Sequence, residues 1–145
     1  VMSLQLLALL VEQQRRSRQT LSALTSATGD LLVYFDRDGI VHSVNRAWED
    51  AWQRHASDVT GRHVIETLQP AQRPAGMPAS IAGALAGRTE QARIEVDLRL
   101  RGRRRMDVAY HPAFDDEGQR IGVVFTAHDV TDLLRTQHEL ERSIA

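Results

Sequence analysis

The stretch "HPAFDDEGQRIGVVFTAHDVT", residues 111 to 131, decides the fold because it contains two strand-like runs joined by a turn. Apolar residues recur at every second position from residue 106 to residue 110, which predicts a strand over residues 106 to 114. The segment "DDEG", residues 115 to 118, is typical of a turn, and residues 121 to 128 have the composition of the next strand. Together these runs predict an antiparallel hairpin.

Three more strands are predicted upstream of this hairpin. Residues 92 to 100 alternate apolar with charged side chains, which indicates one buried and one exposed face, and Gly102 turns the chain into the following strand. Earlier in the chain, Leu31 to Phe35 and Ile40 to Val44 flank the turn "DRDG" and predict a first hairpin.

Helix signals fill the interval between the two groups of strands. Asn45 suits the N-cap of "RAWEDAWQRHA", residues 46 to 56, and Ser57 suits the start of one further turn. The segment "ASIAGALAG", residues 79 to 87, predicts a short helix that ends at a glycine. Two strands, then helices, then three strands predict an α+β domain whose antiparallel sheet is covered on one face by short helices.

Amphipathic helices are predicted on both sides of this domain. The first spans residues 3 to 27 and carries leucines at heptad-like positions, namely Leu7, Leu10, Leu21 and Leu24. The second follows the last strand and places these residues on one seam: Val130, Leu133, Gln137, Leu140 and Ile144.

These patterns divide the chain into three parts. Residues 1–28 are an amphipathic dimerisation helix, residues 29–131 the domain, and residues 132–145 a coiled-coil linker. We expect a parallel homodimer built by the two terminal helices, because both seams need a partner. The second seam is only about two heptads long, so the first helix is expected to carry most of the association.

Two motifs resemble the PAS domain, the sensory module of bacterial signalling proteins. The segment "DGIVHSVNRAW", residues 38 to 48, is similar to the opening motif of that family, and the closing hairpin with Asp129, Val130 and Thr131 is similar to its terminal motif. The resemblance covers roughly residues 22 to 132. It implies sheet order 2-1-5-4-3 and, in many members, a central pocket for a small molecule.

The resemblance also implies a role in signal transduction. We expect a sensor in a multidomain protein of the histidine kinase or diguanylate cyclase type, with its output domain in the same chain. The 145 residues themselves are not expected to be an enzyme.

No cofactor is predicted. The chain has no cysteine, which excludes members that bond a flavin through cysteine. Haem-binding members generally use a histidine on the helix before the third strand, and "MPASIAGALAGR", residues 77 to 88, has none. No two histidines are spaced together with an acidic partner as a metal site would require, so the expected ligand is a small, uncoloured metabolite.

Aromatic residues suggest where such a ligand would lie. Trp48 is expected in the core, because an apolar residue occupies this position in the family. The predicted pocket edge is Trp52 with His55 beside it and Tyr110 or Phe125 across the sheet.

The exit from the last strand is predicted to be stiff. Thr131 can cap the exit helix through its hydroxyl, and Asp129 can accept a charged hydrogen bond from an arginine, with Arg135 the first candidate. The run "RGRRR", residues 101 to 105, is interpreted as a solvated turn.

Three alternatives remain open. The domain could be a ligand-free dimerisation module. His138 could be the phosphoacceptor of a kinase, although "HELERS" lacks the proline and the arginine-threonine pair of that motif. An isomerase with an Asp-Tyr pair is disfavoured, because Asp107 and Tyr110 lie three positions apart and cannot share a strand face.

Composition narrows the partners and the location. A net charge of −1 argues against a nucleic-acid partner, which would require a surplus of positive charge. The apolar run Leu4 to Val11 is too short for a membrane span, although one could lie upstream. We therefore expect a cytoplasmic segment of a protein that could itself be membrane-anchored.

Overall fold

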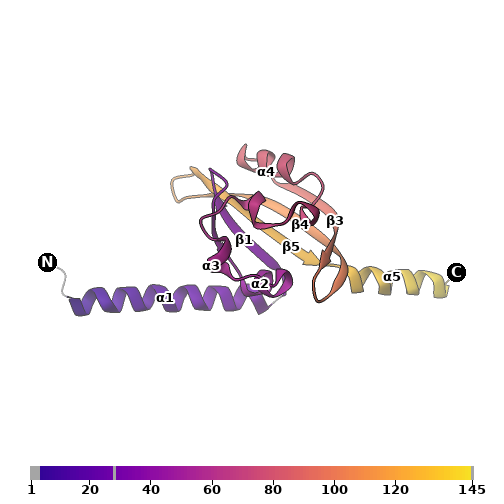
Figure 1. Ribbon diagram of the computed structural model, residues 1–145, viewed down its shortest axis with the longest axis horizontal. Coiled ribbons are helices and arrows are strands. Elements are labelled where there is room, and N and C mark those ends of the chain that lie inside the picture. The colour runs from indigo at the N-terminus through magenta and orange to yellow at the C-terminus, as the bar shows by residue number, and fades with distance from the viewer. Residues whose placement is uncertain (1–3, 28, 145) are drawn as a thin grey trace.

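The structure is a computed structural model that describes residues 4–27 and 29–144, with side chains described for residues 4–16 and 29–144. A five-stranded antiparallel sheet has the order β2-β1-β5-β4-β3, so the predicted sheet is confirmed (Figure 1). The elements, in chain order, are α1 (Leu4–Ala27), β1 (Leu31–Asp36), β2 (Val41–Val44), α2 (Arg46–Trp52), α3 (Ala56–Val59), the 3-10 turns η1 (Val64–Thr67) and η2 (Pro70–Gln72), α4 (Met77–Leu85), β3 (Glu90–Leu98), β4 (Gly102–Phe114), β5 (Arg120–Asp129) and α5 (Thr131–Ile144).

The helices between β2 and β3 cover one face of the sheet. Helix α2 contacts β1, and α4 contacts β3, β4 and β5. Alternation along the strands sends one set of side chains into the core, as the buried Phe35 in β1 and Val123 in β5 show. The tight turn between β1 and β2 is held by the Asp36 carboxylate, which accepts from the backbone N–H of Asp38 at 2.9 Å and of Ile40 at 3.0 Å.

Asn45 joins three elements at the start of the helical layer. Its side-chain oxygen accepts from the backbone N–H of Trp48 at 3.0 Å, which confirms the predicted N-cap. The same oxygen accepts from the N–H of Leu32 in β1 at 3.0 Å, and the side-chain amide donates to the carbonyl of Asp30 at 2.8 Å. The connection from α1 into the sheet is thereby fixed to α2.

Helix α2 is shorter than predicted. Gln53 has φ 53, in the left-handed region, and stops the helix after Trp52 rather than at residue 56. The chain then turns, and the Glu49 carboxylate accepts from the backbone N–H of Ala56 at 2.8 Å. His55 consequently leaves the helix face that carries the tryptophans.

Strand β3 is displaced by two residues from the predicted range. It spans Glu90–Leu98, with Leu98 paired to Gly102, so Leu100 lies in the hairpin turn and is 76% exposed. In the sequence, apolar residues continue to alternate with charged ones as far as Leu100, although the strand itself ends at Leu98. Of the predicted buried face, Val96 and Leu98 are buried.

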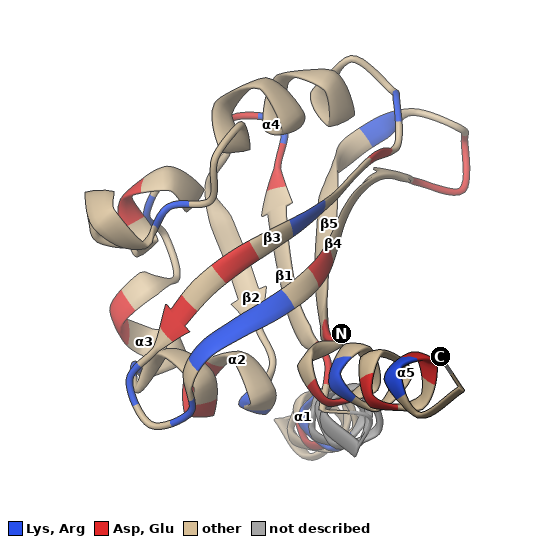
Figure 2. Ribbon diagram, turned by 90° about the vertical axis from the view of Figure 1, so that its right-hand side faces the viewer, with Lys and Arg blue, Asp and Glu red and all other residues tan. Residues whose placement is uncertain are grey.

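Helices α1 and α5 extend in opposite directions from the same end of the domain and lie roughly along one line (Figures 1 and 2). The chain runs in the same direction through both. Exposed apolar side chains occupy the start of α1 (Leu4, Leu6, Leu7, Leu9, Leu10 and Val11). Among the described residues, no helix is long and apolar enough to span a membrane. The side chains of Leu21 and Leu24 lie outside the described residues.

The predicted seam of α5 begins later than expected. Val130 is only 3% exposed and belongs to the domain interior, because its backbone N–H donates to the carbonyl of Arg105 at 2.9 Å. Leu133, Leu140 and Ile144 are exposed by 56%, 60% and 78%. These three residues are the large exposed apolar side chains of α5.

Candidate functional site

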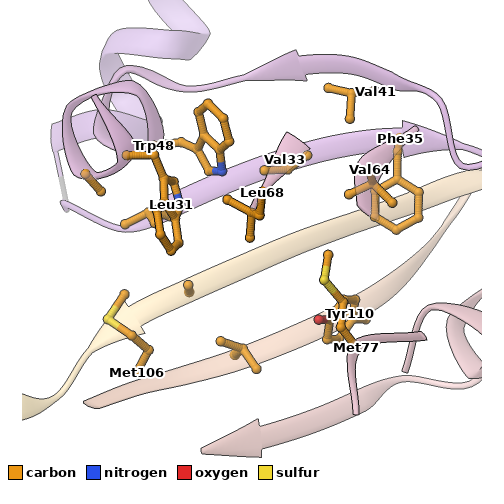
Figure 3. Packing of buried hydrophobic residues seen from close by; sticks show 14 of the residues in the cluster. Leu31, Val33, Phe35, Val41, Trp48, Val64, Leu68, Met77, Met106 and Tyr110 are labelled. Carbon is orange, nitrogen blue, oxygen red and sulfur yellow. The ribbon is translucent and has the colours of Figure 1, made fainter. Parts of the chain in front are cut away.

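A small apolar cavity of about 40 Å³ lies between the inner face of the sheet and the helical layer (Figure 3). Strands β1, β3, β4 and β5 form one wall. Helix α2 and the segment from Val64 to Met77 form the other. We call this segment the roof.

Three of the four predicted pocket residues line this cavity. Trp52 contributes from α2, Tyr110 from β4 and Phe125 from β5, and the rings of Tyr110 and Phe125 lie 5.0 Å apart between centroids. Trp48 lines it as well. His55 does not: it is exposed at the start of α3, because α2 ends at Trp52.

Tyr110 is one of the two residues with a hydroxyl group in the cavity lining, together with Thr67. The residue is 2% exposed, and burial raises the pKa of Tyr110 to about 12. This hydroxyl makes no hydrogen bond to the described residues, and since no fully buried side-chain oxygen or nitrogen among them lacks a partner, the oxygen keeps some exposure. By contrast, the hydroxyl of Thr67 in the roof donates to the carbonyl of Val64 at 2.6 Å.

Two arginines hold the roof in place. The Arg54 guanidinium donates to the carbonyl of Thr67, and Arg73 Nε donates to the carbonyl of Leu68 at 3.2 Å. Thr67 and Leu68 both line the cavity. The closed roof therefore depends on charged hydrogen bonds to backbone atoms directly beside the cavity wall.

A second candidate site is the exit junction, the cluster of Arg104, Asp129 and Thr131 where β5 becomes α5. Arg104 Nε donates to the Asp129 carboxylate at 2.7 Å, and these side chains are 17% and 18% exposed. The other carboxylate oxygen accepts from the backbone N–H of Thr131 at 2.9 Å. Burial acts to raise the pKa of Asp129, but the hydrogen bonds from Arg104 and Thr131 outweigh it, so this pKa is lowered.

The predicted partner of Asp129 was wrong. Arg104 on the neighbouring strand donates to the Asp129 carboxylate instead. Arg135 pairs with Asp132 on the exposed side of α5, with its Nη1 3.8 Å from Asp132 Oδ1. The strand residue reaches the carboxylate because β4 pairs with β5 in the sheet, with Met106 opposite Asp129.

The predicted cap by Thr131 was also wrong. Its hydroxyl oxygen accepts from the backbone N–H of Arg105 in β4 at 2.8 Å instead of capping its own helix. The Asp129 carboxylate instead accepts from the backbone N–H of Thr131, which has no acceptor within the helix because it belongs to the first turn. Helix α5 is thus tied to β4 as well as to the strand that precedes it.

Arg104 was missed because the run 101 to 105 was interpreted as a solvated turn. Arg103, Arg104 and Arg105 all lie in β4 rather than in the turn. The predicted exposure holds for Arg103 and Arg105, whose side chains are 72% and 57% exposed and pair with Glu95. It fails for Arg104, whose side chain is 17% exposed. The register of the closing hairpin, which brings residues just before Met106 beside Asp129, was the signal that could have identified it.

The remaining sequence candidates lie apart from both sites. Asp107 is on the outer face of the sheet, where Arg93 Nε donates to it at 2.6 Å and lowers the pKa of the carboxyl, while Tyr110 faces the interior. His138 is exposed on α5. Within the part of the chain that the structure describes, no three His, Asp or Glu side chains are grouped closely enough to hold a metal ion.

The comparison with protein families decides the identity of the fold. The family described as "PAS fold" matches residues 25–135. The chain belongs to the PAS family. It is a PAS sensory domain, and the sequence resemblance is confirmed. Among curated proteins, no sequence matches the chain.

Solved structures of other proteins, among them PAS domains, have a similar fold. The PAS domain of a protein from Colwellia psychrerythraea is 15% identical, with a TM-score of 0.57, over 78% of this chain and 98% of that chain. The PAS domain of BvgS from Bordetella pertussis is 22% identical, with a TM-score of 0.52, over 87% and 98%. VqmA of Vibrio cholerae, bound to DPO, is 17% identical, with a TM-score of 0.62, over 79% of this chain and 58% of that chain.

Proposed function

We propose that this PAS domain binds a small, uncoloured metabolite in its apolar cavity and passes the signal through α5 to an output domain in the same chain. The output domain is of the histidine kinase or diguanylate cyclase type. The protein is a bacterial, cytoplasmic or membrane-anchored signalling dimer, and Trp52, Tyr110 and Phe125 contact the ligand.

The observation that carries this proposal is that one strand serves both sites. Met106 and Tyr110 of β4 line the cavity, and the backbone N–H of Arg105, next to Met106, is bound by the Thr131 hydroxyl at the start of α5. A ligand that shifts β4 therefore moves the residue that holds the exit helix. This short physical connection joins the cavity to the exit helix.

Native mass spectrometry of freshly purified protein, with an absorption spectrum, tests the ligand. A mass increment that disappears on unfolding is expected, with no visible absorption band. The missing cysteine and the missing histidine on α4 support the absence of a chromophore. A visible band would contradict the uncoloured ligand.

A parallel homodimer forms the second part of the proposal. Exposed leucines and Val11 on α1, and Leu133, Leu140 and Ile144 on α5, support association through both helices. Because α1 and α5 run in the same chain direction along one line, two copies side by side would present two output domains together (Figure 1).

Light scattering tests the dimer. The intact chain is expected to be a dimer and the chain without residues 1 to 20 a monomer or a much weaker dimer, since α5 alone offers a short seam. A tight dimer that survives the deletion would place the interface on the sheet or on α5.

The cavity volume favours one alternative function, a dimerisation module without a ligand. A dry apolar cavity of about 150 Å³ is known to admit benzene, and the cavity here is about 40 Å³. Absence of any mass increment, together with a stable dimer, would support this alternative.

A further inference from the structure

A groove of about 380 Å³ lies beside the exit junction, between the start of β4 and helix α5. Strand β5 ends at Asp129, opposite Met106, so the first residues of β4 extend past β5 and α5 lies beside them. We call this the arginine groove, because four arginines and a histidine line it: Arg103, Arg104, Arg105, Arg135 and His138.

Positive charge is concentrated at the strand wall of this groove. Residues 99 to 105, "RLRGRRR", contain five arginines and no acidic residue, whereas the whole chain has a net charge of −1. The rest of the chain therefore carries a net charge of −6. Figure 2 shows the concentration as the blue stretch at the start of β4. A local potential of this sign attracts anions to one place on a chain that is otherwise acidic.

On the strand wall, two arginines share a single carboxylate. Arg103 Nε lies 3.0 Å from one oxygen of Glu95, and Arg105 Nε lies 3.3 Å from the other. Both contacts run through Nε, which leaves the terminal Nη groups of two exposed side chains for a further acceptor. One positive charge is in excess on this wall.

The helix wall adds donors that the protein holds only weakly. Arg135 and His138 are exposed and lie three positions apart, so they share one face of α5. Arg135 Nη1 is 3.8 Å from Asp132 Oδ1, which is longer than a hydrogen bond. The same carboxylate also lies 3.5 Å from Arg104, whose main partner is Asp129.

The spacing of these groups selects the anion. Side chains two positions apart on a strand are separated by about 6.6 Å, and those three apart on a helix by about 5–6 Å. A single carboxylate would have to draw like charges together, whereas linked phosphates spread their own charges over the same distance. The guanidinium group also matches phosphate oxygens in pairs. Among the described lining residues there is no phenylalanine, tyrosine or tryptophan on which a base could stack.

We infer that the arginine groove binds a small molecule through a diphosphate or triphosphate chain, held by Arg103 and Arg105 on one wall and by Arg135 and His138 on the other. The bound ligand connects α5 to β4 in addition to the exit junction. This site goes beyond the proposed function and does not depend on the apolar cavity.

Isothermal titration with four probes, in buffer without divalent cations, tests the inference. Tripolyphosphate should bind at least tenfold more tightly than citrate, which is also a small polyanion, and than orthophosphate. Adenosine triphosphate should bind about as tightly as tripolyphosphate, because no aromatic side chain of the groove contacts the base. Added salt should weaken all of these affinities.

Three variants that each remove one positive charge locate the site. Arg103→Gln and Arg135→Gln, one on each wall, should each weaken tripolyphosphate about tenfold, as expected for the loss of a charged hydrogen bond. Arg88→Gln is the control: Arg88 is exposed and pairs with Glu90 at the other end of β3, outside the groove. It should leave the affinity unchanged. Circular dichroism checks that each variant is folded.

Hydrogen exchange provides a second measurement. Tripolyphosphate should slow exchange of the backbone N–H groups of residues 131 to 138 in the original chain, because the ligand holds α5 against β4. Arg135→Gln should lose this protection at the same probe concentration. Equal protection in this variant would show that the ligand does not bridge the two walls.

The remaining outcomes are distinct from one another. Equal affinities for citrate and tripolyphosphate would overturn the recognition of phosphate. An equal loss in Arg88→Gln and Arg135→Gln would show that net charge, rather than the groove, attracts the anion. Much tighter binding of adenosine triphosphate than of tripolyphosphate would overturn recognition through the phosphate chain alone. If no probe binds, the inference fails, while the proposed metabolite in the apolar cavity is unaffected.

Discussion

The exit junction and the cavity are held together by different interactions, although β4 and β5 contribute to both. At the junction, Arg104, Asp129 and Thr131 satisfy one another and the backbone N–H of Arg105. The cavity, by contrast, is lined mainly by apolar side chains. Paired polar groups fix one geometry, whereas apolar packing is non-directional.

The largest effect is expected from Asp129→Ala, which leaves the poorly exposed Arg104 guanidinium with only the longer contact to the exposed Asp132 carboxylate at 3.5 Å. The free energy of unfolding should fall by about 2 kcal/mol, measured by urea denaturation. The control is Asp107→Ala, which breaks the exposed pair with Arg93 on the outer face and should have a much smaller effect. Equal losses would show that the junction is no more than a surface ion pair.

Asp129→Ala also tests signal transfer. In the full-length protein, regulation of the output domain should be lost while the PAS domain stays folded, because α5 loses part of its connection to the sheet. Unchanged regulation would contradict a role of the junction in signalling.

The next effect is expected from Thr131→Val, which keeps the shape of the side chain and removes the hydroxyl. The backbone N–H of Arg105 then loses its acceptor, and the free energy of unfolding should fall by about 1 kcal/mol. Thermal and urea denaturation measure this loss. No change would show that water replaces the hydroxyl and that β4 and α5 are less firmly joined than the contact suggests.

Tyr110→Phe should change stability less. The Tyr110 hydroxyl makes no hydrogen bond to the described residues, and no fully buried side-chain oxygen or nitrogen there lacks a partner, so its removal should change the free energy of unfolding by less than about 1 kcal/mol. Tyr34→Phe removes a hydroxyl that donates to the Ile121 carbonyl at 3.3 Å and serves as the comparison. A loss as large as that of Thr131→Val would mean that the Tyr110 hydroxyl has a partner in the free protein.

The sequence predicted most of the sheet because alternation and turn residues are local signals. The closing hairpin and the N-cap by Asn45 are determined by residues close together in the chain. Periodicity also assigned Trp52, Tyr110 and Phe125 to interior faces, and all three line one cavity.

The errors arose where a position depends on contacts distant in sequence. His55 left the cavity because the left-handed Gln53 ended α2 early. Arg104 resembled its exposed neighbours in composition and became partly buried only through pairing with Asp129, 25 residues away. The size of the cavity likewise follows from how the roof packs, which no local pattern records.

The smallest effect on the free energy of unfolding is expected when the pH is lowered. The hydrogen bonds to the Asp129 carboxylate lower its pKa in the folded chain below the unfolded value of about 3.9, despite the opposing effect of burial. The stabilisation is therefore fully present above about pH 4 and is lost as the pH falls through the folded pKa. Asp129→Asn lacks this ionisation, so its deficit in unfolding free energy relative to the original chain should be visible at pH 6 and shrink at pH 3. Tyr110→Phe should keep a constant difference over the same range, because the Tyr110 hydroxyl, with its pKa near 12, stays protonated throughout. A deficit of Asp129→Asn that does not depend on pH would show that the carboxylate contributes through its shape and neutral hydrogen bonds rather than through its charge.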